Sequence, residues 1–294
     1  MADDRAIFTN KFLPYVLVFP QIAIVGVFFL WPGFQAVLLS VFREDAFGTR
    51  RVFVGLENFV RLFANDSYLN SMKVTFFFSI SVMVIVISLG LFFAVLADRV
   101  IRGSNFYTTM IIWPYAVAPA VSGVMWMFLF NPTIGVISHF LGLAGFDWNH
   151  ALNPTHGFLL VTLAASWKQI AYNFLFFLAG LQNIPPSLIE SASIDGAKPG
   201  TRFWKILFPL LSPTTFFLVI MNIMYSFFLT FGIIHQVTQG GPGQATNILV
   251  YKVYRDGFVN LNLGASSAQS VVLMAIVIGL TFIQFHFFER KVHY

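Results

Sequence analysis

Residues 190–197 read Glu190-Ser191-Ala192-Ser193-Ile194-Asp195-Gly196-Ala197, and the chain on either side of them is long, apolar and uncharged. No Asp, Glu, Lys or Arg occurs in residues 169–189 or in residues 206–251. An α-helix needs about 20 mostly apolar residues to cross the hydrocarbon layer of a membrane. The segment is therefore expected to form a short polar element at the membrane surface, between two spanning helices.

The composition is that of a membrane protein. Hydrophobic residues make up 57% of the 294 residues and charged residues only 10%, against about 25% charged in a soluble domain. Cysteine is absent, which excludes disulfides, thiolate catalysis and cysteine-bound metals. The net charge of +5 comes from scattered residues, with no basic run between aromatic residues, so nucleic-acid binding is disfavoured.

The uncharged stretches, trimmed at turn residues, predict a single all-α integral membrane domain over residues 1–294 with six transmembrane helices. The expected helices are residues 13–38, 74–97, 107–130, 157–182, 210–234 and 267–288. Residues 133–146 are too short and too rich in glycine for a seventh span, so an interfacial or re-entrant piece is expected there. The first apolar run is longer than that of a signal peptide and lacks a small-residue cleavage site, which favours a retained span.

The distribution of Lys and Arg sets the expected orientation. With both termini on the inner side, the inner segments carry nine Lys or Arg residues and the outer segments seven, namely Arg43, Arg50, Arg51, Arg61, Lys73, Lys252 and Arg255. Five of the seven lie in the first outer loop, and the remaining loops favour this orientation. Both termini and residues 190–197 are therefore expected in the cytoplasm.

The polar segment has the start and stop signals of a short helix. Pro185 and Pro186 are expected to end the preceding span, because proline cannot donate the backbone N–H that a continuing helix needs. Ser187 can then cap a new helix, with Glu190 three residues later as in a capping box. Gly196 can take the left-handed conformation that ends it. These signals alone fit a docking element and an ordinary interfacial loop equally well.

Lys168 lies near the middle of the fourth expected span. A lysine there costs about 2.5–3.5 kcal/mol on insertion scales, so it is expected to face the bundle interior or an aqueous path. No mid-span carboxylate is available to pair with it, and an anionic solute would supply the missing charge. Other polar residues in the spans could line the same path: Gln169, Asn173, Asn222, Tyr225 and Gln269. The alternatives are hydrogen bonds between helices, or a lysine that snorkels to the membrane surface.

The sequence has no motif for covalent chemistry. The P-loop pattern is absent, so the chain does not itself cradle the phosphates of ATP. The six histidines lack the spacing of metal ligands, and neither a serine–histidine–acid grouping nor an acyltransferase element is found. We therefore expect no catalytic and no metal-binding residues. A secondary transporter would need paired ionisable residues and inverted repeats, and the sequence shows neither.

The motif Glu-x-Ala-x-x-x-Gly, nine residues, then Ile-x-x-Pro in residues 190–209 resembles the coupling loop of binding-protein-dependent ABC importer permeases. The chain departs from that family's pattern at Ser191, where Ala is usual, and at Phe208, where Leu is usual. The permease subunits of sn-glycerol-3-phosphate importers are similar over further segments, which are residues 113–120, 147–150, 166–177, 178–182, 240–246 and 268–274.

This resemblance implies the type I ABC importer permease fold and a multi-pass protein of the bacterial inner membrane. The implied function is that of a permease subunit in an ATP-driven importer of sn-glycerol-3-phosphate or its phosphodiesters. A permease for a neutral sugar or polyol is the alternative, and Lys168 distinguishes the two. The implied partners are a second related permease, a dimer of ABC ATPases that holds ATP and Mg, and a periplasmic solute-binding protein. This chain would hold no cofactor and would not be an enzyme.

The same resemblance assigns two contact surfaces. Coupling to the ATPase would be made by Glu190, Ser191, Ala192, Asp195, Gly196 and Ala197. The binding protein would meet the last outer loop through Gly240, Gly241, Pro242 and Thr246. Force applied to the first surface would move the spans and switch access to the path past Lys168.

Overall fold

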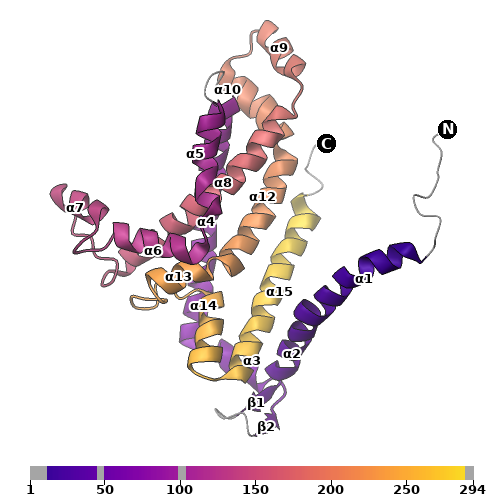
Figure 1. Ribbon diagram of the computed structural model, residues 1–294, viewed down its shortest axis with the longest axis vertical. Coiled ribbons are helices and arrows are strands. Elements are labelled where there is room, and N and C mark those ends of the chain that lie inside the picture. The colour runs from indigo at the N-terminus through magenta and orange to yellow at the C-terminus, as the bar shows by residue number, and fades with distance from the viewer. Residues whose placement is uncertain (1–11, 45–49, 99–103, 289–294) are drawn as a thin grey trace. The chain divides into compact units, whose positions relative to one another are not determined.

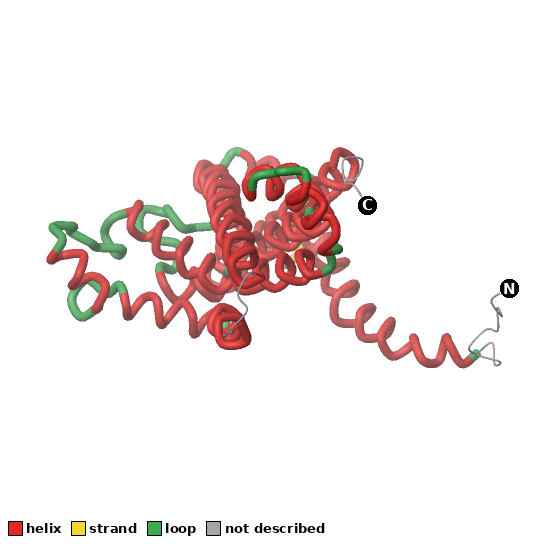
Figure 2. The backbone as a smooth tube through the Cα atoms, turned by 90° about the horizontal axis from the view of Figure 1, so that it is seen from above, coloured by secondary structure: helices red, strands yellow, loops and turns green. Residues whose placement is uncertain are grey.

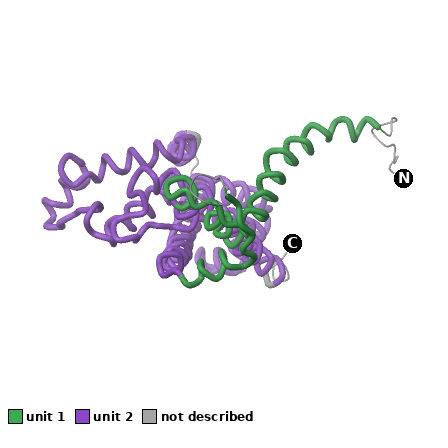
Figure 3. Tube along the Cα trace, turned by 90° about the horizontal axis from the view of Figure 1, so that it is seen from below, with its two compact units in different colours: residues 1–64, 256–272 green, residues 65–255, 273–294 purple. Residues whose placement is uncertain are grey.

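The computed structural model describes residues 12–44, 50–98 and 104–288, and most of this part of the chain is helical (Figures 1 and 2). The chain forms two compact units, residues 1–64 with 256–272 and residues 65–255 with 273–294 (Figure 3). The expectation of one membrane domain over the whole chain stays a prediction. The terminal cations on which the expected orientation partly rests, Arg5, Lys11, Arg290 and Lys291, lie outside the described residues, as do Arg99 and Arg102.

The first unit begins with one long helical stretch made of α1 (Leu13–Val25), η1 (Gly26–Leu30) and α2 (Trp31–Ser40). It is long and apolar enough to cross a membrane, as expected for residues 13–38. None of its 18-residue apolar window is buried inside the structure. In a bilayer such a helix is covered by lipid or by another membrane protein rather than by water.

A short antiparallel hairpin follows, which departs from the expected all-α architecture. Strand β1 (Phe42–Glu44) pairs with β2 (Arg51–Phe53), and helix α3 (Glu57–Phe63) comes next. Glu57 forms ion pairs at 2.7 Å with both Arg43 and Arg61. The hydrogen bond from Arg43 is the main reason that the pKa of Glu57 is lowered. Two of the five basic residues of this loop are thus held by a single carboxylate.

The second unit is organised around α4 (Asp66–Asp98) and α8 (Pro154–Gln182), which run side by side with α5 (Ser104–Ala116) and α12 (Ser212–Met224) (Figure 1). The buried residues of α4 recur every three or four positions and are small or β-branched over most of its length: Ser71, Thr75, Ser79, Val82, Val86, Gly90, Ala94 and Ala97. Small residues allow helix backbones to approach closely in membranes. At Gly90 an added Cβ would lie 2.6 Å from the Cβ of Asn173 on α8.

The third expected span is not one straight helix. It is broken between α5 and α6 (Pro119–Leu129), which are bent by 101°. Ala118, before the proline, has an extended conformation (φ −61°, ψ 143°), because proline disfavours helix in the residue that precedes it. α6 then packs closely on α13 (Phe231–Val237). A Cβ added at Gly232 of α13 would lie only 3.2 Å from the backbone nitrogen of Ala120.

The fifth expected span is also interrupted: one helix runs through α12 and the π-helical turn η3 (Tyr225–Leu229), and the chain turns at Thr230 before α13. Among the described residues four helices, or five if the bent pair counts as one span, pass a test of length and hydropathy. α8 has the length, at 29 residues, but carries three strongly polar side chains near its middle. The number of six spans and the orientation of the termini stay predictions.

The remaining elements are short apart from the last helix. α7 (Val136–Leu143) has eight residues, about 12 Å of helix, and is too short to span, as expected for this region. The others are α9 (Pro186–Ile194), α10 (Pro199–Arg202), η2 (Phe203–Leu207), α11 (Phe208–Leu210), α14 (Leu249–Tyr254), η4 (Arg255–Val259) and α15 (Leu263–Phe288).

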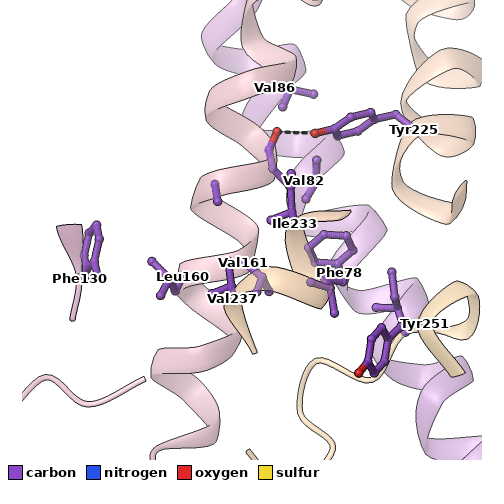
Figure 4. Packing of buried hydrophobic residues seen from close by; sticks show 14 residues of the cluster. Phe78, Val82, Val86, Phe130, Leu160, Val161, Tyr225, Ile233, Val237 and Tyr251 are labelled. Carbon is purple, nitrogen blue, oxygen red and sulfur yellow. Dashed lines mark hydrogen bonds between the residues drawn. The ribbon is translucent and has the colours of Figure 1, made fainter. Parts of the chain in front are cut away.

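A buried apolar cluster joins the helices of the second unit (Figure 4). Phe78 and Val82 of α4 meet Val161 of α8 and Ile233 of α13, and all four side chains are fully buried. Tyr225 of η3 joins them and donates its hydroxyl to the carbonyl oxygen of Ala165 at 3.0 Å. The cluster therefore ties the broken fifth span to the α4–α8 pair.

The packing at Gly90 generates a test of this arrangement. We expect Gly90→Ala to destabilise the protein by about 1–3 kcal/mol, because the added methyl group forces α4 away from α8. Gly279→Ala in α15 is the matched control, since an added Cβ there has nothing within 4 Å. Thermal unfolding in detergent measures both variants, and equal melting temperatures for them would contradict the predicted close contact.

Candidate functional site

A cavity of about 400 Å³ lies where α5 ends and α6 begins, against α8 and the α12–η3 segment. Its lining combines polar and aromatic side chains, namely Tyr115, Lys168, Gln169, Tyr172 and Tyr225, with apolar ones that include Met221, Met224 and Leu229. A concave, mostly apolar site with a few polar groups is the usual form of a small-molecule site. The helix break before Pro119 creates one wall of this cavity.

Lys168 is 8% exposed and makes two contacts with the same residue of the broken span. Its Nζ donates to the carbonyl oxygen of Tyr115 at 2.8 Å and lies 4.8 Å from the centroid of the Tyr115 ring. Tyr115 is the penultimate residue of α5, so its carbonyl is one of the acceptors that a helix end leaves free. Among the described residues no Asp or Glu forms an ion pair with Lys168. The sequence offered no mid-span carboxylate for Lys168, and the structure gives it a neutral carbonyl and an aromatic ring face as contacts instead.

Asn173 and Asn222 do not line the cavity. Both are fully buried, and they exchange hydrogen bonds between α8 and α12 at 2.8 and 3.1 Å. Gln169 donates to the same Asn222 oxygen at 3.1 Å while also bordering the cavity. The geometry of the two asparagines therefore matches the alternative of helix–helix hydrogen bonding.

The two remaining candidates for the path, Tyr225 and Gln269, lie in different parts of the structure. Tyr225 borders the cavity, but its hydroxyl is held by Ala165. Gln269 belongs to the first unit and donates to Asp256 Oδ2 at 2.6 Å. Sequence reasoning missed Tyr115 and Tyr172, which face the cavity. Pro114 and Pro119 lie on either side of the helix break, and they are the sequence signal that could have pointed to Tyr115.

The expected surface helix is α9, although it begins differently from the expectation. Pro185 occupies the N-cap position and Pro186 the first turn, and no side chain caps the helix. The predicted capping box of Ser187 and Glu190 is therefore wrong. Pro186 occupies the first helical position, where a backbone N–H would have no partner within the helix in any case. Glu190 is exposed.

The end of α9 is as expected. Gly196 has φ +79°, and the N–H groups of Ala197 and Gly196 donate to Ala192 and Ser193 at 2.9 and 3.1 Å. These bonds form a Schellman motif, which closes the helix rigidly. Arg202 of α10 donates to the hydroxyl of Ser193, so α9 and α10 are linked. The segment is a compact, exposed projection.

The glycine-rich loop near residue 240 is folded on itself. Gly240 and Gly243 have positive φ angles of 81° and 56°, which favour glycine. Thr246 is 1% exposed and donates to the carbonyl oxygen of Gly241 at 2.8 Å. Thr246 therefore supports the loop from inside, and Gly243 is on its exposed side.

Comparison with known proteins identifies the fold and relatives of the chain. The family model described as binding-protein-dependent transport system inner membrane component matches residues 87–294. The sn-glycerol-3-phosphate transport system permease protein UgpA of Rhizobium meliloti (strain 1021) is 59% identical over 99% of both chains. The protein of the same name from Pectobacterium atrosepticum is 54% identical over the full length of both.

A solved structure shows the same fold at low identity. A chain of a bacterial alginate ABC transporter, in complex with an alginate pentasaccharide-bound periplasmic protein, superposes with a TM-score of 0.82 at 18% identity. The match covers 96% of this chain and 95% of that one. The expected ABC importer permease fold is confirmed.

The asparagine pair can be tested by a double-mutant cycle. We expect a coupling free energy of about 0.6–1.7 kcal/mol between Asn173→Ala and Asn222→Ala, because each single variant leaves a buried amide without its partner. Unfolding of the purified protein in mixed micelles measures the four members of the cycle. Additive effects would mean that the two amides do not interact.

Proposed function

Because the chain belongs to the family of binding-protein-dependent transport system inner membrane components, we propose that it is the permease subunit of an ABC importer for sn-glycerol-3-phosphate. The proposal rests mainly on its similarity to permeases of that name, which reaches 59% identity over 99% of each chain. The protein would reside in the bacterial inner membrane as a multi-pass subunit. It would move the solute without covalent change.

The cavity at the helix break supplies a chemical reason for an anionic solute. The ammonium of Lys168 is held by a neutral carbonyl and a ring face, not by a carboxylate. Hydrogen bonds to a charged oxygen are roughly twice as strong as those to a neutral one. A phosphate ester entering the cavity would therefore displace the Tyr115 carbonyl as the partner of Nζ. Gln169 and Tyr172 would face the glycerol hydroxyls.

The proposed assembly contains a second related permease, two ABC ATPase subunits and a periplasmic solute-binding protein. ATP and Mg would be held by the ATPases, and this chain would hold no cofactor. Residues 190–197 would sit in a groove of one ATPase, with Glu190 facing basic groups there. The outer loop around Gly240–Gly243 would meet the binding protein.

The packing behind α9 suggests how force would reach the cavity. α9 connects α8 to the segment that leads into α12, and the two spans touch where an added Cβ at Gly180 would lie 2.9 Å from Leu211. Further along, Asn173 and Asn222 bond the same two helices next to the cavity wall. A displacement of α9 would therefore move α8 and α12 together and change access to Lys168.

A permease for a neutral sugar or polyol remains the second candidate, and one observation favours it. Lys168 already has a hydrogen-bond acceptor and an aromatic face within the chain. A lysine satisfied in this way needs no anion for its burial. The two candidates differ in whether removing the charge of Lys168 affects transport.

Lys168→Gln tests the role of the charge. We expect uptake of sn-glycerol-3-phosphate by vesicles containing the complete importer to fall about 10- to 100-fold, because a charge-assisted hydrogen bond of about 1.5–3 kcal/mol is lost. Lys73→Gln, which removes an exposed lysine of the same chain, is the matched control and should keep normal uptake. Unchanged uptake in Lys168→Gln would favour the neutral solute.

Glu190→Ala and Gly196→Pro test the coupling surface. We expect both variants to retain ATP hydrolysis while uptake falls at least 10-fold, since α9 would lose a charged contact or the left-handed turn that closes it. The ratio of solute taken up to ATP hydrolysed, measured in proteoliposomes, reports the coupling. A normal ratio in both variants would contradict the assignment of α9 as the docking element.

A further inference from the structure

A second cavity, of about 680 Å³, lies outside the site described above. It is a groove between the last turns of α4 and the segment that follows α9. Ile87, Leu91, Phe92 and Val95 of α4 form one side, and Pro199, Gly200, Phe203, Trp204 and Phe208 form the other. Ser88 is the one polar residue in this lining. The groove is therefore apolar along the membrane-spanning helix.

The groove lies at one end of a span. α4 ends at Asp98, and the lining residues of α4 occupy the three turns before that carboxylate. On the other side, Trp204 is 64% exposed although it lines the groove. Tryptophan is enriched at the boundary between hydrocarbon and water, where its ring is buried and its N–H stays wet. The groove thus opens at the depth where lipid chains meet their headgroups.

Two lysines are adjacent in the chain to residues of this lining. Lys198 precedes Pro199 in the chain and Lys205 follows Trp204, and both lysines are exposed. Arg202, between them, is engaged by Ser193 of α9. In the described part of the chain, neither lysine forms an ion pair with a carboxylate. An apolar groove whose lining residues Pro199 and Trp204 each have an exposed lysine next to them in the chain has the charge and polarity that complement an anionic amphiphile.

We propose that this groove binds an anionic phospholipid of the leaflet next to α9, with an acyl chain against Phe92 and Trp204 and the phosphate against Lys198 and Lys205. The groove joins α4 to the segment that carries α9, so a bound lipid would brace the element through which force enters the bundle. The lipid site is independent of the solute, because none of its lining residues borders the cavity of Lys168.

Quenching of Trp204 fluorescence by brominated lipids tests the proposal. The complete complex is placed in phosphatidylcholine nanodiscs that contain increasing fractions of brominated phosphatidylglycerol or brominated phosphatidylcholine. The Trp204 signal is obtained by subtracting the emission of a Trp204→Phe variant. We expect half-maximal quenching at a fraction of phosphatidylglycerol at least five-fold lower than that of phosphatidylcholine, because each lysine near the headgroups favours an anionic lipid about five-fold.

The lysine variants separate a built site from general contact with the bilayer. Lys198→Gln and Lys205→Gln together should abolish the preference for phosphatidylglycerol, while Lys73→Gln should preserve it. Equal quenching by both brominated lipids in the unmodified protein would overturn the proposal, since it would show contact with bulk acyl chains only. Absence of quenching would also overturn it, by showing that another subunit covers the groove.

Discussion

The close contact between Gly90 of α4 and Asn173 of α8 is the constraint on which the helix arrangement of the second unit depends. In a bilayer, helices gain little from hydrophobic burial against one another, so packing and hydrogen bonds hold them together. The missing side chain of Gly90 lets α4 seal Asn173 from lipid. A sealed amide must find a partner, because an unpaired buried polar group is costly. Asn222 of α12 is that partner. The close packing at Gly90 thereby helps to position α4, α8 and α12 relative to one another.

The break between α5 and α6 provides a hydrogen-bond acceptor for the buried Lys168. Burying a lysine is expensive, and the carbonyl of Tyr115 that the break releases offsets part of that cost. The same break opens the cavity beside Lys168, so that the stabilising contact and the candidate solute site share one residue. The neutral carbonyl satisfies the lysine in the absence of solute, and an anionic oxygen of the solute could replace it as the hydrogen-bond acceptor. This property connects the local stability of the span to the proposed transport.

Rigid connections run from the exposed α9 into the bundle. α9 ends in a Schellman motif and is bonded to Arg202 of α10. Further along, α8 contacts the start of α12 at Gly180 and is hydrogen-bonded to α12 through Asn173, so a displacement of α9 would be transmitted to both helices. The apolar groove beside the same segment adds a second support that, in our proposal, the membrane itself provides. The importer would then depend on its lipid surroundings as well as on its partner subunits.

The sequence by itself determined the membrane class, the approximate position of the helices, the surface helix ending at Gly196 and the family, because these follow from the order and spacing of residues along the chain. It also singled out Lys168, since a charge within a span is rare. Only the tertiary structure decided that the third and fifth expected spans are broken, and that Asn173 and Asn222 are hydrogen-bonded to each other between two helices. The partner of Lys168 likewise lies 53 residues away in the sequence. Such contacts depend on which faces of distant helices meet, and the period of a single helix carries no information about its neighbour.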